Sequence, residues 1–406
     1  MTIAPEKTAR LQQINAARAH TDALFRLLHP GALYERPIPE RHRLIFYTGH
    51  LEAFDWNLIG RRTLGLSPFH PAFDKLFEFG IDPEPGKAAA DQPSDWPSVH
   101  EIEKYSRRVR EALDRDIDAI PEEIFHTSLE HRWMHAETLS YLFHALPYSA
   151  KVPADQPEAP RMSALPKSRT IEISPGKATL GQDALEFGWD NEFASHSVPV
   201  PGFAIAKFKV TNGDYLRFVQ DGGEAPHFWF RSGNEHFYRG MFETIPLPLD
   251  WPVYATQEQA AAYARWAGKS LPTEEQFHRA AYGTPNGVER SYPWGESQPN
   301  PGRGNFDFSR WDPVPVHATP FGDSAFGVSQ LLGNGWEWTS TIFHPFRGFT
   351  ARDYYAGYSA NFFDGCHFVM KGGSPQTAAC LLRRSFRNWF RPNYPYMYAT
   401  FRLVEN

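Results

Sequence analysis

The sequence predicts an α+β protein of more than one domain, with a helical N-terminal part and an irregular, β-containing C-terminal part. In the first 150 residues, apolar side chains recur at helical spacing and the helical stretches contain little proline. After residue 170, short β-like runs lie between clusters of glycine, asparagine and tryptophan. Aromatic residues make up 15% of the 406-residue chain, which argues against disorder, and 30 glycines with 35 prolines favour a loop-rich globular fold.

Four segments of about 20 residues each predict a four-helix bundle in residues 1–150. Their apolar spacing places them at 6–29, 40–64, 98–118 and 121–146. Pro121 stands where the fourth helix is expected to begin, which suits proline because the first backbone N–H groups of a helix have no partner. The stretch 66–97 contains glycine and proline and is expected to be an irregular connection.

Residues 151–170 are rich in proline and predict a linker between two domains. Residues 171–406 are expected to form the second domain, with β-like runs at FAIAKFKVT, HFVMKGG and YATFRLV. Amphipathic helices are expected near 211–221 and 256–268. A third helix is expected to begin after Thr273, because this threonine and the glutamine three residues later have the spacing of a capping box.

Composition and charge exclude several functions. A net charge of −6 without a basic block leaves no electrostatic footprint for nucleic acid, so no nucleic-acid partner is expected. No apolar run approaches the roughly 18 residues of a membrane span, and the N-terminus has no apolar signal-peptide core, so we expect a cytoplasmic protein without a membrane partner. The two cysteines, Cys366 and Cys380, form neither a CxxC motif nor a disulfide framework.

Two histidines four residues apart mark the first candidate site. His131 and His135, in EHRWMHAETL, lie about 40° apart around a helix and one turn apart, as two imidazoles must to hold one metal ion. The third ligand has to come from another helix, and His50 stands among apolar residues of the second predicted helix. Three neutral imidazoles suit zinc or Fe(II). Spacing alone also allows ordinary surface or core histidines, and Glu137 is either an acceptor that orients a ligand or a solvated carboxylate.

Tryptophan, asparagine and arginine gather in three turn-rich stretches of the second domain, at 333–341, 371–374 and 383–392. A tryptophan face attracts quaternary ammonium groups by cation–π contact and an asparagine adds polar orientation, so these stretches are candidates for a pocket wall. The same residues also suit an irregular core built from glycine and tryptophan, and composition does not separate the two interpretations.

Taken together, the motifs resemble two known domain families. VTNGDYLRFVQDGG, SLPTEEQFHRAA, FGVSQLLGNGWEWTST and RRSFRNWF occur in the order seen in formylglycine-generating-enzyme-like domains, which are related to C-type lectins. GHLEAFDW and HRWMHAE resemble parts of a DinB-like four-helix bundle. This pairing, together with GWDNE at 188–192, resembles the nonheme-iron sulfoxide synthases of ergothioneine biosynthesis and their selenoneine synthase relatives.

The resemblance implies an Fe(II) enzyme that uses O2 to join sulfur or selenium to the imidazole C2 carbon of hercynine, which is N-alpha-trimethylhistidine. His50, His131 and His135 match the family's iron ligands. Asn388 and Trp389 match the residues that contact the trimethylammonium group. Three protein ligands leave positions at which the imidazole, the chalcogen donor and O2 can meet.

Two departures from the family pattern bear on the chalcogen donor. Met134 stands where the family carries a glutamine that touches hercynine, so one polar contact is lost. The stretch 87–99 has no arginine, whereas relatives that use gamma-glutamylcysteine carry donor-binding arginines there. We therefore expect a neutral donor, a selenosugar, and hence a selenoneine synthase. The alternative donor is cysteine or gamma-glutamylcysteine, giving a hercynyl sulfoxide, with its carboxylate bound by Arg107, Arg108 or Arg110.

The resemblance also implies a tyrosine that donates a proton or an electron in some members. Its spacing before YSANFF makes Tyr355 the best match, and the neighbouring Tyr354 and Tyr358 serve equally well in packing. Formylglycine-generating activity is not expected, because neither cysteine occupies the family's reactive positions. A hypothesis from another class is a noncatalytic, lectin-like binding protein with a metal-binding helical scaffold.

Overall fold

The computed structural model describes residues 3–78, 90–157 and 169–405. The chain divides into two compact units, Met1–Ala154 and Asp155–Asn406. The division falls inside the stretch 151–170 that the sequence predicts as a linker, and residues 158–168 of that stretch lie outside the described residues. In the described part of the chain, no helix is long and apolar enough to cross a membrane.

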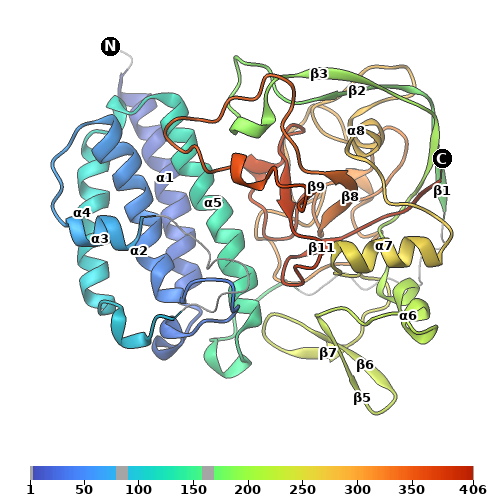
Figure 1. Cartoon of the computed structure of the whole chain (residues 1–406), viewed down its shortest axis with the longest axis horizontal. Helices are drawn as coiled ribbons and strands as arrows, with labels where there is room; N and C mark the ends of the chain where they lie inside the picture. Colours follow the sequence, from blue (N-terminus) through green and yellow to red (C-terminus); the bar gives the residue numbers. More distant parts are fainter. Residues whose placement is uncertain (1–2, 79–89, 158–168, 406) are drawn as a thin grey trace. The chain divides into compact units, whose positions relative to one another are not determined.

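The first unit is a bundle of four long helices, as predicted (Figure 1). These helices are α1 (Ile3–Phe25), α2 (Leu44–Asp55), α4 (Val99–Arg115) and α5 (Glu122–Ala145). α1 packs against α5, and α2 packs against α4. The second predicted helix is longer than α2 because the chain continues without a break as a π-helix, η2 (Trp56–Thr63). Short 3-10 turns are η1 (Pro30–Tyr34), η3 (Pro93–Asp95), η4 (Ile117–Ala119) and η5 (Tyr148–Ala150).

Local sequence explains where these helices begin and which face they bury. The Ser98 hydroxyl accepts a hydrogen bond from Glu101 N (3.4 Å), and the Glu101 carboxylate accepts one from Ser98 N (3.0 Å), so a capping box opens α4. Pro121 immediately precedes α5, as the sequence predicts. The buried face of α4 follows the three- and four-residue spacing of an amphipathic helix, at Ile102, Tyr105, Val109 and Leu113.

The connection at 66–97 includes residues 79–89, which lie outside the described residues, and its described part is more ordered than the sequence predicts, because it contains a short helix, α3 (Pro71–Leu76). A proline at its first position suits a helix start, and the His70 side chain accepts a hydrogen bond from Phe73 N (3.2 Å). Phe73 and Phe77 are buried, with their ring centroids 5.4 Å apart. Burial of apolar side chains, which local sequence does not reveal, therefore stabilises this helix.

The second unit consists of short strands in four small sheets. One antiparallel sheet has the order β1 (Thr170–Ile173), β4 (Phe203–Ala206), β12 (Val404–Glu405). Another has the order β10 (Asn388–Phe390), β9 (Phe368–Lys371), β8 (Trp336–Ile342), β11 (Ala399–Thr400). The remaining pairings join β2 (Gly176–Leu180) to β3 (His196–Val200), and β5 (Trp229–Ser232) to β6 (Glu235–Arg239) to β7 (Thr244–Pro246).

The described residues of this unit also form three α-helices: α6 (Asn212–Gln220), α7 (Gln257–Trp266) and α8 (Glu274–Tyr282). Each follows a threonine whose hydroxyl accepts a hydrogen bond from the third backbone N–H of the helix. The capping box predicted for α8 is confirmed, since Thr273 Oγ1 accepts from Gln276 N (3.2 Å) and Gln276 Oε1 accepts from Thr273 N (3.0 Å).

A buried ion pair ties the end of the chain to the second sheet. The Arg402 guanidinium donates to both carboxylate oxygens of Glu337, at 2.6 and 2.7 Å, and neither side chain is exposed. Arg402 also donates to the carbonyl oxygen of Ser329 (2.9 Å). This forked pairing holds β8 in place, and through β8 the neighbouring strands β9 and β10.

Candidate metal centre

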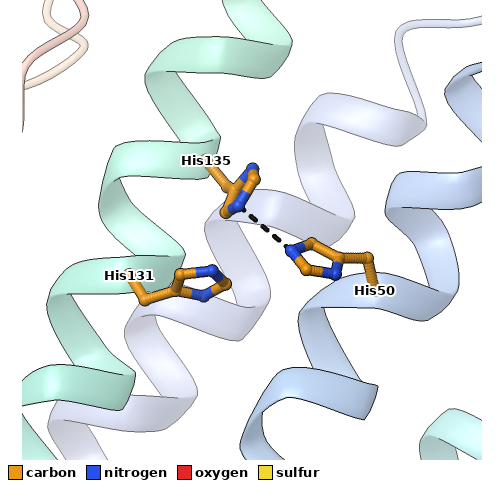
Figure 2. A group of neighbouring side chains, drawn as sticks. All are labelled: His50, His131 and His135. Carbon is orange, nitrogen blue, oxygen red and sulfur yellow. Dashed lines mark hydrogen bonds between the residues drawn. The ribbon is translucent and has the colours of Figure 1, made fainter. Parts of the chain in front are cut away.

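Three histidines from two helices of the bundle converge on one point (Figure 2). His50 extends from α2, and His131 and His135 extend from successive turns of α5. One ring nitrogen of each histidine lies within 4.8 Å of those of the other two. His50 Nε2 and His135 Nε2 are 3.2 Å apart. The structure therefore brings together the three candidate ligands of the sequence analysis.

The backbone that follows α3 orients His50. Its Nδ1 lies 2.8 Å from the carbonyl oxygen of Phe77 and 3.0 Å from that of Glu78. Because a carbonyl oxygen only accepts, Nδ1 carries the proton and donates, and the lone pair lies on Nε2, the nitrogen that faces His135. Sequence reasoning missed this contact, since a backbone carbonyl leaves no signature in the pattern of side chains.

Apolar rings enclose the histidines and keep them neutral. Phe46 stacks on His50 with centroids 4.8 Å apart, and Phe54 stacks on His131 at 3.5 Å. Burial lowers the pKa of His50 to about 4 and holds the pKa values of His131 and His135 well below their usual value. All three imidazoles are therefore neutral at pH 7, the form in which a lone pair is available to a metal ion.

This set of donors fits Fe(II). Within the described residues, the cluster of metal-binding groups consists of the three histidines and includes no carboxylate or thiolate. Imidazole nitrogens suit iron and zinc, and three protein ligands leave further coordination positions open to small molecules. The ion that the family resemblance implies is therefore compatible with the residues present.

Met134 and Glu137 lie close to His135 on α5 and differ in the polar groups that they bring to the site. Met134 is half-buried, and its thioether provides no N–H or O–H donor in place of the amide that glutamine would supply. Glu137 is buried, but His135 Nδ1 makes no hydrogen bond to any residue that the structure describes. The burial of Glu137 contradicts its interpretation as a solvated carboxylate, and the described residues show no hydrogen bond from His135 Nδ1 to it.

The arginines considered as alternative donor ligands have different surroundings. Arg110 donates to both carboxylate oxygens of Asp22 (2.7 and 2.8 Å) and to Glu52 (2.7 Å). The Arg108 guanidinium lies 4.2 Å from the centroid of the Phe69 ring. Arg107 is exposed on α4. Arg110 is the most buried of these three arginines, and it is already paired with two carboxylates of the protein.

Asp91 anchors the described part of the stretch that the sequence analysis linked to the donor. Its carboxylate accepts hydrogen bonds from Arg36, from Arg43 Nε (3.0 Å) and from the Trp96 indole (2.9 Å). Arg43 Nη2 also donates to the Asp91 carbonyl oxygen (2.9 Å). The Trp96 ring then packs edge-on against Phe46 at 6.0 Å, and Phe46 is the ring that covers the first ligand.

In the second unit, Trp389 belongs to an aromatic cluster. Its indole stacks on Phe343 with centroids 4.2 Å apart and meets Tyr358 edge-on at 5.4 Å. Asn388 Oδ1 accepts a hydrogen bond from Trp389 N (2.9 Å). Because successive residues of a strand point to opposite faces of the sheet, the side chains of Asn388 and Trp389 leave β10 on opposite faces.

Tyr355 is held by the GWDNE motif. Trp189 stacks on Tyr358 at 4.1 Å and meets Tyr355 edge-on at 6.2 Å, while the Ser359 hydroxyl donates to Asp190. Burial and the negative charge of Asp190 raise the pKa of Tyr355 to about 12. The phenol is therefore protonated at pH 7 and can act as a proton donor. The contact between the GWDNE motif and this loop joins residues 169 positions apart, so no local pattern in the sequence indicates it.

The fold joins a helical bundle, which carries the candidate metal site, to a domain of short strands. Residues 13–146 match the model of the DinB superfamily, and residues 155–406 match that of the Sulfatase-modifying factor enzyme 1-like domain. The chain belongs to the ergothioneine-biosynthesis family that includes the hercynine oxygenases.

Individual relatives extend over both units. The chain is 32% identical over 372 residues to Hercynine oxygenase of Mycolicibacterium thermoresistibile, covering 82% of this chain and 80% of the relative. It is 34% identical to Hercynine oxygenase of Mycobacterium tuberculosis, covering 74% and 76%. Ergothioneine biosynthesis protein 1 of Neurospora crassa is 28% identical, covering 98% of this chain and 57% of that protein. A solved structure, PvdO from Pseudomonas aeruginosa, aligns over 58% of this chain and 93% of its own, with 21% identity and a TM-score of 0.43.

Proposed function

We propose that this enzyme uses Fe(II) and O2 to form a bond between a chalcogen atom and the imidazole C2 carbon of hercynine. The observation that carries the proposal is the convergence of three neutral imidazoles from α2 and α5, of which His50 and His131 are buried and His135 is half-buried. His50, His131 and His135 would hold the iron, which supplies the redox chemistry with O2. Membership of a family with hercynine oxygenases supports hercynine as the acceptor.

The residues expected to bind hercynine offer complementary chemistry. Stacking on Phe343 holds the Trp389 indole in one orientation, and an indole face attracts a trimethylammonium group by cation–π contact. Asn388 leaves β10 on the face opposite to Trp389, so in our proposal it acts on hercynine indirectly, by holding the Trp389 backbone through the hydrogen bond from Trp389 N to its Oδ1. Met134 adds an apolar contact, and the protonated Tyr355 serves as the proton donor in our proposal.

For the donor, we propose a selenosugar, which makes the product a precursor of selenoneine. Three arginines support this choice of donor, because each is already paired with a carboxylate of the protein. Arg36 and Arg43 pair with Asp91, which lies in the stretch 87–99, and Arg110 pairs with Glu52. A carboxylate of an amino-acid donor would have to displace one of these protein carboxylates to reach Arg36, Arg43 or Arg110. A sugar without a carboxylate meets no such competition.

Cysteine or gamma-glutamylcysteine is the second candidate donor. The names of the relatives favour it, since ergothioneine contains sulfur and these relatives are hercynine oxygenases and an ergothioneine biosynthesis protein. In this case the product would be a hercynyl sulfoxide, and the exposed Arg107 would be available for the donor carboxylate.

Competition between donors tests the proposal. The protein would be loaded anaerobically with Fe(II) and mixed with hercynine, selenoglucose, thioglucose, cysteine and gamma-glutamylcysteine, and O2 would then be admitted. A dominant selenium adduct, recognised by its isotope pattern in mass spectrometry, is expected. A dominant cysteine-derived sulfoxide would refute the selenosugar and support the second candidate. The His131→Ala variant is the control, and turnover by that variant would refute the iron site.

A further inference from the structure

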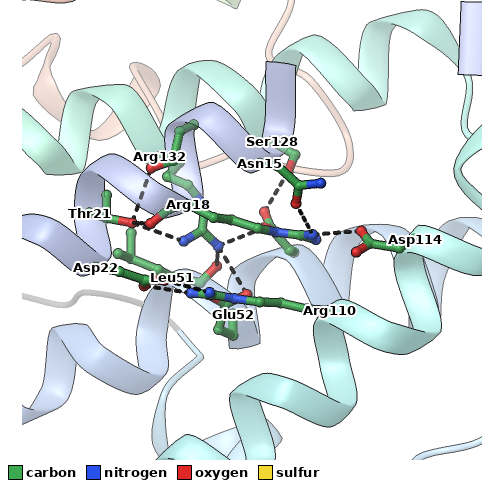
Figure 3. A network of polar contacts seen from close by, with 12 residues as sticks. Asn15, Arg18, Thr21, Asp22, Leu51, Glu52, Arg110, Asp114, Ser128 and Arg132 are labelled. Atoms are coloured by element: carbon green, nitrogen blue, oxygen red, sulfur yellow. Dashed lines mark hydrogen bonds and ion pairs between the residues drawn. The ribbon is translucent and has the colours of Figure 1, made fainter. Parts of the chain in front are cut away.

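A buried guanidinium joins the two helices that carry the histidines (Figure 3). Arg132 on α5 is 1% exposed. Its Nη2 lies 3.0 Å from a carboxylate oxygen of Glu52, 3.0 Å from one of Asp55, and 3.2 Å from the carbonyl oxygen of Leu51. All three of these partners belong to α2. Arg132 Nη1 also lies 3.4 Å from the hydroxyl of Thr21 on α1.

Further contacts hold the partners of this guanidinium. Glu52 also accepts from Arg110 Nη2 (2.7 Å), and the Ser128 hydroxyl donates to Asp55. Ser128 lies one turn before Arg132 on α5, so two side chains of α5 donate hydrogen bonds to the Asp55 carboxylate on α2. Glu52 and Asp55 are each 1% exposed, and hydrogen bonds from Arg110 to Glu52 and from Arg132 and Ser128 to Asp55 hold the two carboxylates.

These bonds lie next to the metal ligands in the sequence. Arg132 follows His131 directly, and Leu51, whose carbonyl oxygen it binds, follows His50 directly. A change in the register of α2 against α5 would thus break these bonds and separate the histidines together. Apolar contacts between helices tolerate small slides, whereas the two hydrogen bonds that Arg132 Nη2 donates to Leu51 and Asp55 depend on direction and distance.

Stability alone does not explain such a network. Removing three charged groups from water costs free energy that their attraction only partly returns, and apolar side chains of similar size often stabilise a fold equally well. A ligand set for a metal ion has a stricter requirement, because its donors must keep their separation within about 0.5 Å. The placement of the network beside the ligands matches that requirement.

We propose that Arg132 is a positioning residue for the metal centre, which through Leu51, Glu52 and Asp55 sets the separation of His50 from His131 and His135 before the ion binds. The inference rests on the proposed function for the presence of a metal ion. It concerns the affinity and geometry of that ion and does not depend on the identity of the chalcogen donor.

Co(II) binding to the full-length protein tests this inference, because the visible absorption of Co(II) reports its coordination geometry without turnover. Arg132→Met is expected to weaken Co(II) binding roughly 10–100-fold, as loss of a residue that orients metal ligands typically does, and to change the absorption bands. Arg132→Lys keeps the charge but lacks the fork, so an intermediate affinity is expected. The matched control is Arg10→Met, since Arg10 also bridges the bundle, to Ile117 O, Ile120 O and Glu122, at a distance in sequence from the ligands.

Arg132→Met leaves the Asp55 carboxylate buried without its cation, while Glu52 keeps Arg110, and the variant can fail to fold. The double variant Arg132→Met, Asp55→Asn removes that unpaired charge, and the same loss of Co(II) affinity is expected for it. Wild-type affinity and spectrum in a folded Arg132 variant, or an equal loss in Arg10→Met, would overturn the inference alone. A wild-type protein that binds neither Co(II) nor Fe(II) would overturn the proposed function, and the inference with it.

Discussion

Replacing Gly49 by alanine tests whether the backbone after α3 sets the geometry of the metal centre. Gly49 precedes His50 on α2, and an added Cβ would lie 2.6–2.7 Å from three atoms of the Phe77 ring. Phe77 is fully buried, and its carbonyl oxygen accepts the hydrogen bond from His50 Nδ1 (2.8 Å). The added methyl group would therefore displace the residue that orients the ligand.

Two opposing effects determine the change in stability. Alanine is preferred over glycine in a helix interior by about 1 kcal/mol, whereas overpacking a core costs about 1–3 kcal/mol. To reach an ordinary carbon–carbon separation of about 3.5 Å, the Phe77 ring must move by about 0.8 Å, against the rings of Phe46, Phe73 and Trp96. A similar shift of the Phe77 carbonyl lengthens its 2.8 Å hydrogen bond to about 3.6 Å, beyond hydrogen-bonding range.

We therefore expect Gly49→Ala to lower the free energy of unfolding by about 1 kcal/mol, whereas helix propensity alone predicts an increase. We also expect the variant to bind Co(II) roughly tenfold more weakly. Chemical denaturation followed by circular dichroism and Co(II) titration measure the two effects. Gly31→Ala is the control, because an added Cβ there has no atom within 4 Å. A Gly49→Ala protein that is more stable than wild type and binds Co(II) equally well would refute this reasoning.

Three further predictions concern the ligands and the second unit. Alanine at any one of the three ligand histidines is expected to abolish iron loading, measured as iron per chain after anaerobic reconstitution, and full loading would contradict the assignment. Trp389→Ala is expected to weaken hercynine binding by about 0.5–2 kcal/mol in calorimetry, the range of a cation–π contact, and unchanged affinity would remove Trp389 from the binding site. Tyr355→Phe is expected to remove a tyrosine that ionises near pH 12 from the spectrophotometric titration of the folded protein. Because burial and Asp190 raise the folded pKa of Tyr355 above its usual value of 10, its contribution to stability is complete below pH 10 and is lost as the pH rises through 12. Ionisation of Tyr355 at pH 10 in the native protein would contradict this prediction.

Helical periodicity and capping signals predicted much of the fold. All four bundle helices lie within a few residues of their expected positions, and Thr273 opens α8 as its capping box indicates. These signals are local, so a single sequence reveals them. The helix α3 was missed because it has only 6 residues, too few for periodicity to show, and depends on the burial of Phe73.

The candidate site was less predictable from the sequence than the helices were. The spacing of His131 and His135 indicated a metal pair on one helix face, but His50 became a ligand candidate of equal weight only through the family resemblance. The Phe77 carbonyl that orients His50 and the Asp91 carboxylate that occupies two arginines were not predicted. Both contacts join residues whose types are common in any sequence, so no pattern distinguishes them.

By itself, the sequence determined the four bundle helices, the helices α6 to α8, the neutral donor types at the metal centre and the absence of arginine in the stretch 87–99. These properties reside in residue identity and in spacings of three or four residues. Only the tertiary structure decided which nitrogen of His50 faces the other ligands and which carboxylates pair with Arg132. The physical reason is distance along the chain: His50 and Phe77 are 27 residues apart and Arg132 and Asp55 are 77 apart, so these directional contacts exist only once the helices have packed.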